Sequence, residues 1–225
     1  MDHLFLSRTQ LFRGNSPQEV EQMLGCLQAQ VRKYVRGSVI CRAGDVVHAL
    51  GMVLSGSVSI ENDDVWGNKS ILGKLGPGQV FAETYACIPG EPLMISVVAA
   101  EEAEILFLDV GRVLTVCSNA CTFHHKLIRN LLAISAQKNL QLSRRIFHTS
   151  SKSIRGRLLS YLSFQAAQQG SCEFEIPFSR QQLADYLSVD RSAMSNELSK
   201  MQRDGLLRVD RNRFYLEMEH FDQEL

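Results

Sequence analysis

Residues 179–216 contain two helical patterns that are separated by a short break and followed at once by two short strand patterns. The first helix is predicted to start at Ser179, which has the spacing of a capping box with Gln182. The second is predicted to start after Asp190, because the apolar periodicity breaks at 188–190 and an aspartate can cap a helix. The apolar positions of the two helices are Leu183, Ala184 and Leu187, then Ala193, Met194, Leu198 and Met201. This arrangement predicts a helix-turn-helix.

The two strand patterns predict a two-stranded wing directly after the second helix. Leu206–Val209 and Arg213–Leu216 flank a polar tip at 210–212, whose residues favour turns. Arg211 and Arg213 put two cations beside this tip. A basic hairpin in this place suits contact with phosphates.

The exposed face of the second predicted helix carries short polar and cationic side chains. They are Arg191, Ser192, Ser195, Asn196 and Lys200. Such groups can reach base edges and phosphates without filling the major groove, so the sequence predicts binding to double-stranded DNA. Two alternatives stay open here, since a helix pair with a tight turn is also a common structural unit and a winged helix can serve protein contacts.

Charge is unevenly distributed, although the formal net charge of the chain is +0. Residues 1–122 carry 9 Lys and Arg against 13 Asp and Glu, whereas residues 123–213 carry 15 against 7. A basic half joined to a mildly acidic half suits a DNA-binding domain attached to a control domain, because phosphate contacts supply most of the sequence-independent affinity. A solvated basic face is the alternative interpretation.

The first half of the chain consists of short apolar runs with glycines between them. From about Val31 to Asp109 the runs are VLSGSVSI, SILGKL, QVFAE, MISVVA and EILFLD. Many short strands with glycine-rich turns predict an antiparallel sandwich or barrel. A small helix over Glu19–Gln30, with Pro17 near its start, is expected on the outside. With 225 residues and 45% hydrophobic content, the chain is long enough for two domains.

A long helical pattern from Phe123 to Phe147 follows these strands. Its four-three repeat, which is typical of a coiled-coil seam, consists of Ile128, Leu132, Ser135, Asn139, Leu142 and Ile146. This spacing predicts a homodimer that pairs through the helix. A second apolar set could instead pack the helix against its own barrel, namely Leu127, Leu131 and Ile134. Small polar residues at Thr149–Ser153 end the pattern, and we expect a hinge there.

The sequence indicates neither a membrane segment nor an enzyme. No apolar run approaches the roughly 18 residues that span a bilayer, and MDHLFLSRTQ lacks the features of a signal peptide, so we expect a cytoplasmic protein without membrane contact. A barrel enzyme of the cupin type needs several histidines inside the barrel, yet residues 31–112 contain only His48. No P-loop and no GxSxG elbow occurs either, so no catalysis is expected.

The cysteines and histidines form one pattern of candidate metal ligands. Cys117, Cys121 and His124 have the i, i+4, i+7 spacing of one helical face, and Cys87 could be a fourth ligand. Sulfur and imidazole ligands suit zinc, an iron–sulfur cluster or haem. The same residues could form a reversible thiol sensor or pack as ordinary core residues, because cysteine is among the most buried residue types. These three alternatives stay open.

The order of barrel, long helix, polar hinge and winged helix-turn-helix resembles the bacterial Crp/Fnr transcription regulators over nearly the whole chain. The most specific segments are GMVLSGSVSI at 51–60, LGPGQVFAE at 75–83, AEILFLD at 103–109 and SRQQLADYLSVDRSAMSNELSKMQRDGLL at 179–207. The resemblance implies an α+β protein whose N-terminal antiparallel β-barrel is a double-stranded β-helix like that of cyclic-nucleotide-binding domains. It implies three parts, which are an effector-sensing domain at 1–122, a dimerisation helix at 123–148 and a DNA-binding domain at 149–225.

Members of this family typically bind an effector in the barrel and a palindromic operator as homodimers, and RNA polymerase is an implied partner. The residues implied for the effector pocket are Glu83, Thr84, Leu93, Met94, Ile128 and Leu132. The residues implied for DNA contact include the exposed side chains of the second helix that are named above. They also include Ser179, Arg180 and Gln181 at the start of the first helix, and Arg211 and Arg213 in the wing.

One departure from the family pattern concerns the ligand. Relatives that bind cyclic AMP hold its phosphate with an Arg-Ser pair, whereas the corresponding positions here are Leu93 and Met94. A phosphate buried there would lack its charge-assisted partners, so cyclic AMP and cyclic GMP are not expected to bind, although Glu83 is present. The effector is therefore unidentified, and a metal, haem or iron–sulfur cofactor is an alternative.

Two further departures concern the helix-turn-helix. Asn196 and Ser192 stand where the family often has Arg and Glu, so we expect a different operator from that of the better-known relatives. Ser188 stands where the turn usually has Gly, which implies a non-glycine residue with positive φ, at a cost of about 1 kcal/mol.

Overall fold

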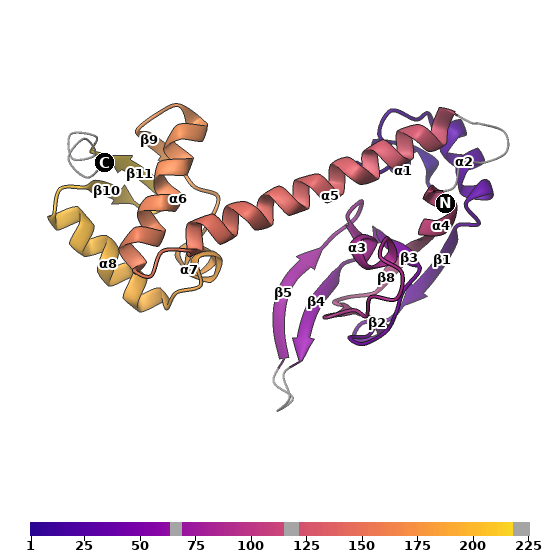
Figure 1. Ribbon diagram of the computed structural model, residues 1–225, viewed down its shortest axis with the longest axis horizontal. Helices are drawn as coiled ribbons and strands as arrows, with labels where there is room; N and C mark the ends of the chain where they lie inside the picture. Colours follow the sequence, from indigo (N-terminus) through magenta and orange to yellow (C-terminus); the bar gives the residue numbers. More distant parts are fainter. Residues whose placement is uncertain (64–68, 115–121, 218–225) are drawn as a thin grey trace. The chain divides into compact units, whose positions relative to one another are not determined.

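The computed structural model describes residues 1–63, 69–114 and 122–217 (Figure 1). The chain divides into two compact units, Met1–Gln137 and Lys138–Leu225. Helix α5 (Thr122–Thr149) contributes residues to both of them. Across the described ranges, no helix is long and apolar enough to cross a membrane.

The described part of the N-terminal unit contains two antiparallel four-stranded sheets. The first has the order β1 (Gln30–Tyr34), β8 (Ala103–Asp109), β3 (Ala49–Ser55) and β6 (Val80–Phe81). The second has the order β2 (Val39–Cys41), β7 (Ser96–Ala99), β4 (Val58–Asp63) and β5 (Lys69–Leu75). Strands far apart in sequence thus lie side by side, such as β3 and β8, where Leu50 is opposite Leu108.

These sheets form a sandwich, which is one of the two arrangements that the strand pattern predicted, and not the closed barrel that the family resemblance implied. Val53 and Ile105 of the first sheet share one fully buried core with Val58 and Val97 of the second. Within the described strands, no edge strand of one sheet pairs with a strand of the other. Packing two sheets face to face buries their apolar sides without closing the ring of hydrogen bonds, so the strand pattern was right and the closure was wrong.

Helices cover the outer face of the first sheet. The helices α1 (His3–Arg8), α2 (Pro17–Cys26), α4 (Val110–Leu114) and α5 contribute to a second buried core on this face, which includes Leu50, Met52, Leu106 and Leu108. A short helix, α3 (Glu83–Ala86), follows β6.

Helix α2 confirms the predicted outer helix with different ends. The Ser16 side chain and Glu19 form a capping box, so the helix starts at Pro17. It ends at Cys26, and Gln28 has a φ of +49°, which turns the chain into β1. The expected extension to Gln30 was therefore wrong.

The two apolar sets predicted on the long helix have different surroundings. Leu127, Leu131 and Ile134 are at most 6% exposed and belong to the core on the outer face of the first sheet. In contrast, Leu132, Leu142 and Ile146 are more than 60% exposed, at 68%, 61% and 68%. The first set thus packs the helix against its own unit. Of the seam set, Leu132, Leu142 and Ile146 lie on the surface of the chain, whereas Ile128 packs partly against the same core.

The C-terminal unit contains the predicted helix-turn-helix and wing together with two elements that the sequence analysis missed. The missed elements are α6 (Ile154–Gln169) and β9 (Glu173–Glu175). The others are α7 (Arg180–Leu187), α8 (Arg191–Arg203), β10 (Leu207–Asp210) and β11 (Arg213–Leu216). Strand β9 pairs with β11, so the described sheet has three strands in the order β10-β11-β9, and the two-stranded prediction is corrected. Phe174 is the only apolar residue of β9, because Glu173 and Glu175 stand on either side of it, so the sequence shows no strand pattern there.

A break between helices occurs at the predicted hinge. Helix α5 ends at Thr149, whose hydroxyl donates to the Arg145 carbonyl at 2.8 Å. Helix α6 starts after Ser153, whose Oγ accepts a bond from the Gly156 N–H at 3.0 Å. A Cβ on Gly156 would lie 2.1 Å from the Ser151 Oγ, so any side chain there would have to displace the Ser151 hydroxyl.

Candidate nucleic-acid interface

The start of helix α7 has the predicted capping box. The Ser179 Oγ accepts a bond from the Gln182 N–H at 3.3 Å, and the Gln182 side chain accepts one from the Ser179 N–H at 2.8 Å. Two backbone donors at the helix start are thereby satisfied, which fixes where α7 begins. Gln181 is exposed, and its Nε2 donates to Asp185 at 2.8 Å.

The turn between α7 and α8 has the predicted strained residue. Ser188 has a φ of +54°, in the left-handed region that favours glycine. Arg157 of α6 donates to the carbonyls of Leu187 and Ser188 at 3.1 and 2.9 Å, and also to the carbonyl of Ser151 at 2.8 Å. A cation at a helix C-terminus satisfies its free carbonyls and stabilises the turn.

Helix α8 has one buried face and one exposed face. Asp190 caps its start by accepting a bond from the Ala193 N–H at 2.8 Å. Met194, Leu198 and Met201 are at most 3% exposed and pack in the core of this unit. The buried face therefore fixes the rotation of α8 about its axis and decides which side chains meet the solvent.

The predicted reading residues lie on the exposed side of α8. Arg191, Ser192, Asn196 and Lys200 are exposed. Ser195 is half-buried, and its hydroxyl donates to the Arg191 carbonyl at 2.9 Å, so it has less freedom to reach a base than its neighbours.

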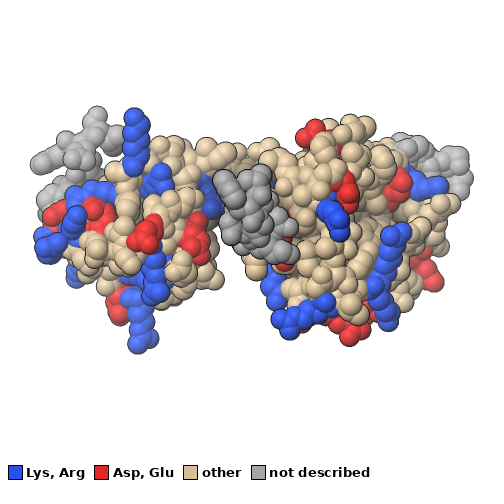
Figure 2. Space-filling model, turned by 90° about the horizontal axis from the view of Figure 1, so that it is seen from below, with Lys and Arg blue, Asp and Glu red and all other residues tan. Residues whose placement is uncertain are grey.

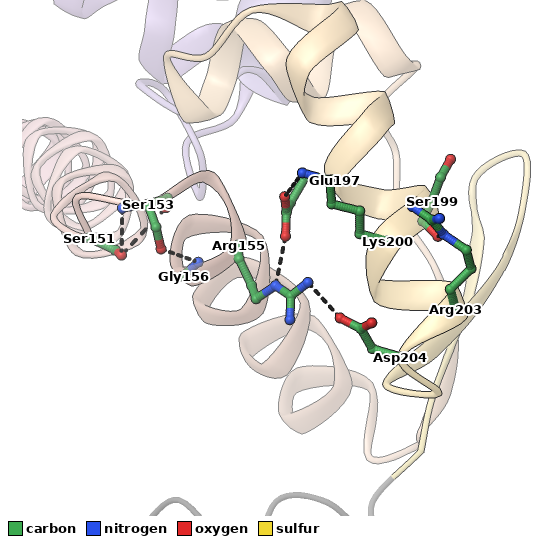
Figure 3. Close-up of polar contacts among 9 residues, drawn as sticks. All are labelled: Ser151, Ser153, Arg155, Gly156, Glu197, Ser199, Lys200, Arg203 and Asp204. Atoms are coloured by element: carbon green, nitrogen blue, oxygen red, sulfur yellow. Dashed lines mark hydrogen bonds and ion pairs between the residues drawn. The ribbon is translucent and has the colours of Figure 1, made fainter.

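Two exposed residues on the same helix were missed by the sequence analysis. Ser199 and Arg203 follow Asn196 at three- and four-residue spacing, and both are exposed. The Arg203 Nε lies 3.4 Å from the Ser199 carbonyl (Figure 3). Extending the polar face by one further turn of helical periodicity would have found them.

An ionic cluster joins α6 to α8 (Figure 3). The Arg155 guanidinium donates to the carboxylates of Glu197 and Asp204, each at 2.6 Å. These bonds raise the pKa of Arg155, with the hydrogen bond to Glu197 as the largest cause. Lys200 lies 3.8 Å from Glu197, so the recognition-helix lysine faces a carboxylate that Arg155 already holds.

Arg180 occupies a different position from that expected of a phosphate ligand. Its guanidinium lies over the Phe214 ring, 5.2 Å from the centroid, and its Nη1 is buried without a hydrogen-bond partner among the described residues. Burial lowers the pKa of this group. Arg180 thus packs α7 against the wing strand β11.

The wing arginines differ in their partners. Arg211 is exposed at the tip with a φ of +53°, and no ion pair to it occurs among the described residues. Arg213 pairs with Glu173 of β9 at 2.8 Å. A third arginine, Arg208, pairs with Glu217 at 3.2 Å and lies over the Tyr215 ring. Arg211 therefore has the greatest freedom to meet a phosphate.

The face in Figure 2 shows basic side chains lying among acidic ones in both units, without a single continuous basic patch. The basic excess of the C-terminal half is thus distributed over its surface on this side of the molecule.

The six residues implied for an effector pocket do not share one environment. Glu83 and Leu93 are 3% and 2% exposed in the N-terminal unit, whereas Met94 and Leu132 are 74% and 68% exposed. Thr84 is exposed and Ile128 is half-buried against the core under the first sheet.

The candidate metal site is only partly within the described residues. Cys117 and Cys121 lie outside them. Cys87 is exposed, with its pKa raised mainly by partial burial, while His124 is 3% exposed. Among the residues that the structure describes, no group of three or more His, Cys, Asp or Glu side chains could hold a metal ion.

Comparison with known proteins gives one family pattern for both units. Residues 31–120 match the cyclic nucleotide-binding domain, and residues 156–220 match the Crp-like helix-turn-helix domain. The cyclic AMP receptor protein of Thermus thermophilus is 29% identical over 200 residues, which cover 88% of each chain.

Solved structures agree with this pattern. The crystal structure of the Thermus thermophilus catabolite activator protein is 26% identical, covers 96% of this chain and 97% of its own, and has a TM-score of 0.52. CprK complexed with OCPA is 15% identical, covers 87% of this chain and 91% of its own, and has a TM-score of 0.60, which supports the fold.

Proposed function

Because this chain belongs to the Crp/Fnr family of DNA-binding transcription regulators with an effector-sensing domain, we propose that it binds a palindromic operator as a homodimer under effector control. The observation that carries this proposal is the exposed face of α8, where Arg191 and Asn196 project from a helix whose other face is fixed by burial. Such a helix can enter the major groove with a defined orientation.

The division of labour among the contacts follows from side-chain chemistry. A guanidinium at Arg191 can grip the O6 and N7 of guanine, and the carboxamide of Asn196 can pair with the N6 and N7 of adenine. Arg211 at the wing tip suits a flanking phosphate, which positions the protein without reading sequence. Ser179 and Gln181 remain proposed contacts at the start of α7, whereas Arg180 is proposed to support the wing from beneath.

The exposed seam of α5 supports a homodimer. Leu132, Leu142 and Ile146 repeat at seam spacing on a surface that the chain's own core does not cover. Ser135 and Asn139 lie within the same repeat and would fix its register at some cost in stability. A second copy of this helix buries the apolar residues and sets two α8 helices at a fixed separation, as a palindrome requires.

The effector is proposed to differ from cyclic AMP. The Thermus relative is named for that ligand, but Leu93 and Met94 offer its phosphate no cation here. We also propose that the protein acts in the cytoplasm by binding and not by catalysis, with RNA polymerase as its partner at the promoter. A metal or thiol sensor involving Cys87, Cys117, Cys121 and His124 is the alternative, and Cys117 and Cys121 lie outside the described residues.

Selection of binding sites from random duplex DNA with the full chain tests the proposal. We expect a palindrome with two half-sites about one helical turn apart, bound more weakly as salt rises. Arg129→Ala, an exposed arginine on α5, is the control for non-specific loss of charge and should return the same palindrome. Selection that returns no symmetric motif, with binding equal on all sequences, contradicts the proposal.

A further inference from the structure

A cavity of about 300 Å³ opens between strands of the two sheets in the N-terminal unit. Its lining includes Arg32, Tyr34, Ile40, His48, Phe107 and Asp109. None of these is among the residues that the family resemblance implies for the effector pocket. The volume is at the lower end of the range for small-molecule sites.

The strand register places Arg32 on the core-facing side of β1. Arg32 is opposite Ile105 in the β1–β8 pair, and Ile105 is fully buried in the core of the sandwich. Directly opposite residues project to the same face of a sheet. The neighbouring Lys33 projects to the other face, where it pairs with Glu104 at 2.8 Å. Lys33 thus has a carboxylate partner on the other face, while Arg32, which is exposed, lines the cavity from the sheet face that carries Ile105.

The Arg32 guanidinium has no carboxylate partner among the described residues. It lies over the Phe107 ring, 5.4 Å from the centroid, and donates to the Gln30 side-chain oxygen at 3.0 Å. The Asp109 carboxylate also lines the cavity, but its Oδ1 accepts a bond from the Arg112 N–H at 3.0 Å. The cavity therefore presents a positioned cation that retains donors for an acceptor ligand.

The remaining lining combines the polar residues Gln28, Gln30 and His48 with an apolar part. The rings of Tyr34 and Phe107 meet edge to face at 6.5 Å, and Ile40 and Val47 add aliphatic surface. Cys41, also in the lining, is a neutral thiol at physiological pH, because burial raises its pKa to about 11. A ligand body in contact with these residues gains most if it is flat and apolar.

We propose that this cavity binds a small monocarboxylate with a flat apolar body, its carboxylate on Arg32 and its body against Phe107. A guanidinium matches a carboxylate with two parallel hydrogen bonds, which a neutral ligand cannot form. The Asp109 carboxylate also lines the cavity and repels a doubly charged phosphate more strongly than a singly charged carboxylate, so phosphates fit less well. Use of this site as the effector site of the regulator rests on the proposed function, whereas binding of the carboxylate does not.

Benzoate is the probe for the test, with benzamide as its neutral match. Methyl resonances of Ile40 and Val47 in the full chain, without DNA, report the site directly. We expect benzoate to shift both at millimolar concentration, benzamide to bind roughly tenfold more weakly, and inorganic phosphate to leave them unchanged. Because no DNA is present, the result is independent of whether the chain binds an operator.

Variants assign the binding to Arg32. Arg32→Gln should weaken benzoate roughly tenfold, and Arg32→Lys, which keeps the charge and loses the planar fork, by a smaller factor of about three. Lys33→Gln removes the same charge from the other face of β1 and should bind like the wild type. Shifts absent from Ile40 and Val47, or equal affinity in wild type and both Arg32 variants, overturn the proposal.

Discussion

The Nε atom of Arg155 lies 2.6 Å from the Oε1 atom of Glu197, so α6 holds the middle of the recognition helix by an ion pair. The same guanidinium reaches Asp204, the C-cap residue of α8, also at 2.6 Å (Figure 3). One side chain thereby links two points along α8 to α6. The Glu197 side chain is only 18% exposed, so it depends on this partner more than a surface carboxylate would.

Arg155→Ala should lower the free energy of unfolding by about 1 kcal/mol, because Glu197 keeps only the more distant Lys200 as a cationic neighbour. It should also weaken operator binding, since α8 loses a support outside the groove. Denaturant unfolding and binding titrations measure the two effects. Arg36→Ala, an exposed arginine of the N-terminal unit, should change neither, and an Arg155→Ala protein as stable as wild type would show that the pair contributes nothing.

Charge on the α5 seam should break the homodimer. Leu132→Glu with Leu142→Glu puts carboxylates on two residues that are exposed in the single chain and buried in the proposed pair. Sedimentation should show a monomer with much weaker operator binding. Leu140→Glu is the matched control, because Leu140 is 50% exposed on the same helix but outside the four-three repeat. A wild-type chain that sediments as a monomer at micromolar concentration, with or without DNA, rules out this dimer.

Alanine substitutions of base-reading residues and of phosphate-contacting residues should change DNA binding in different ways. Arg191→Ala or Asn196→Ala should cost about 1 to 3 kcal/mol on the cognate operator and relax base preference. Arg211→Ala should weaken binding to all sequences alike and lower the salt dependence by roughly one ion. Selection from random DNA and salt titration measure both. The same palindrome at the same stringency for wild type and both α8 variants would mean that α8 is not the reading helix.

Cyclic AMP should not bind with useful affinity. A cyclic phosphate placed near Leu93 and Met94 loses its hydration without gaining a cation, which costs several kcal/mol. Calorimetric titration of the full chain should show no heat of binding at micromolar nucleotide. Micromolar binding that also strengthens operator affinity would refute this expectation.

The free energy of unfolding should decrease in acid, because protonation of His148 favours the unfolded chain. This residue is 1% exposed, its Nδ1 lies 3.2 Å from the Ser160 Oγ, and its ring meets those of Tyr161, Phe164 and Tyr186. Burial, and secondly Arg144, lower the pKa of His148 below its ordinary value of about 6.5. The unfolded chain therefore binds the proton more readily, so the free energy of unfolding should decrease as pH drops below about 6.5.

The His148→Gln variant isolates this contribution, because glutamine stays neutral over the same range. Melting temperatures of wild type and variant between about pH 5 and 8 should converge toward the acid end if His148 carries the difference. A constant gap at every pH would show that protonation of His148 is not linked to folding.

Local sequence patterns were sufficient for the elements that depend on nearby residues. The capping box of α7 and the start of α8 at Asp190 follow from side chains within four positions of the backbone they bond. The apolar periodicity of α5 likewise predicted both of its faces. These features are determined by the sequence because their hydrogen bonds and spacing are local.

Features built from distant segments were decided by the tertiary structure. Strand β9 is marked by a single buried residue, Phe174, and exists because β11 supplies its hydrogen bonds. The packing of Arg180 depends on Phe214, which lies 34 positions later in the chain and provides the ring over which its guanidinium lies. Whether the strands closed into a barrel or packed as a sandwich depended on which sheet edges meet.

The sequence by itself determined the starts of α7 and α8 and the polar face of α8, because each is encoded in spacing along the chain. Only the tertiary structure decided that Arg155 supports α8, that Arg180 is held by the wing and that Arg32 faces a cavity between the sheets. A cation in a sequence has no intrinsic role, since its partner is set by which distant segment packs beside it and how much water that packing removes.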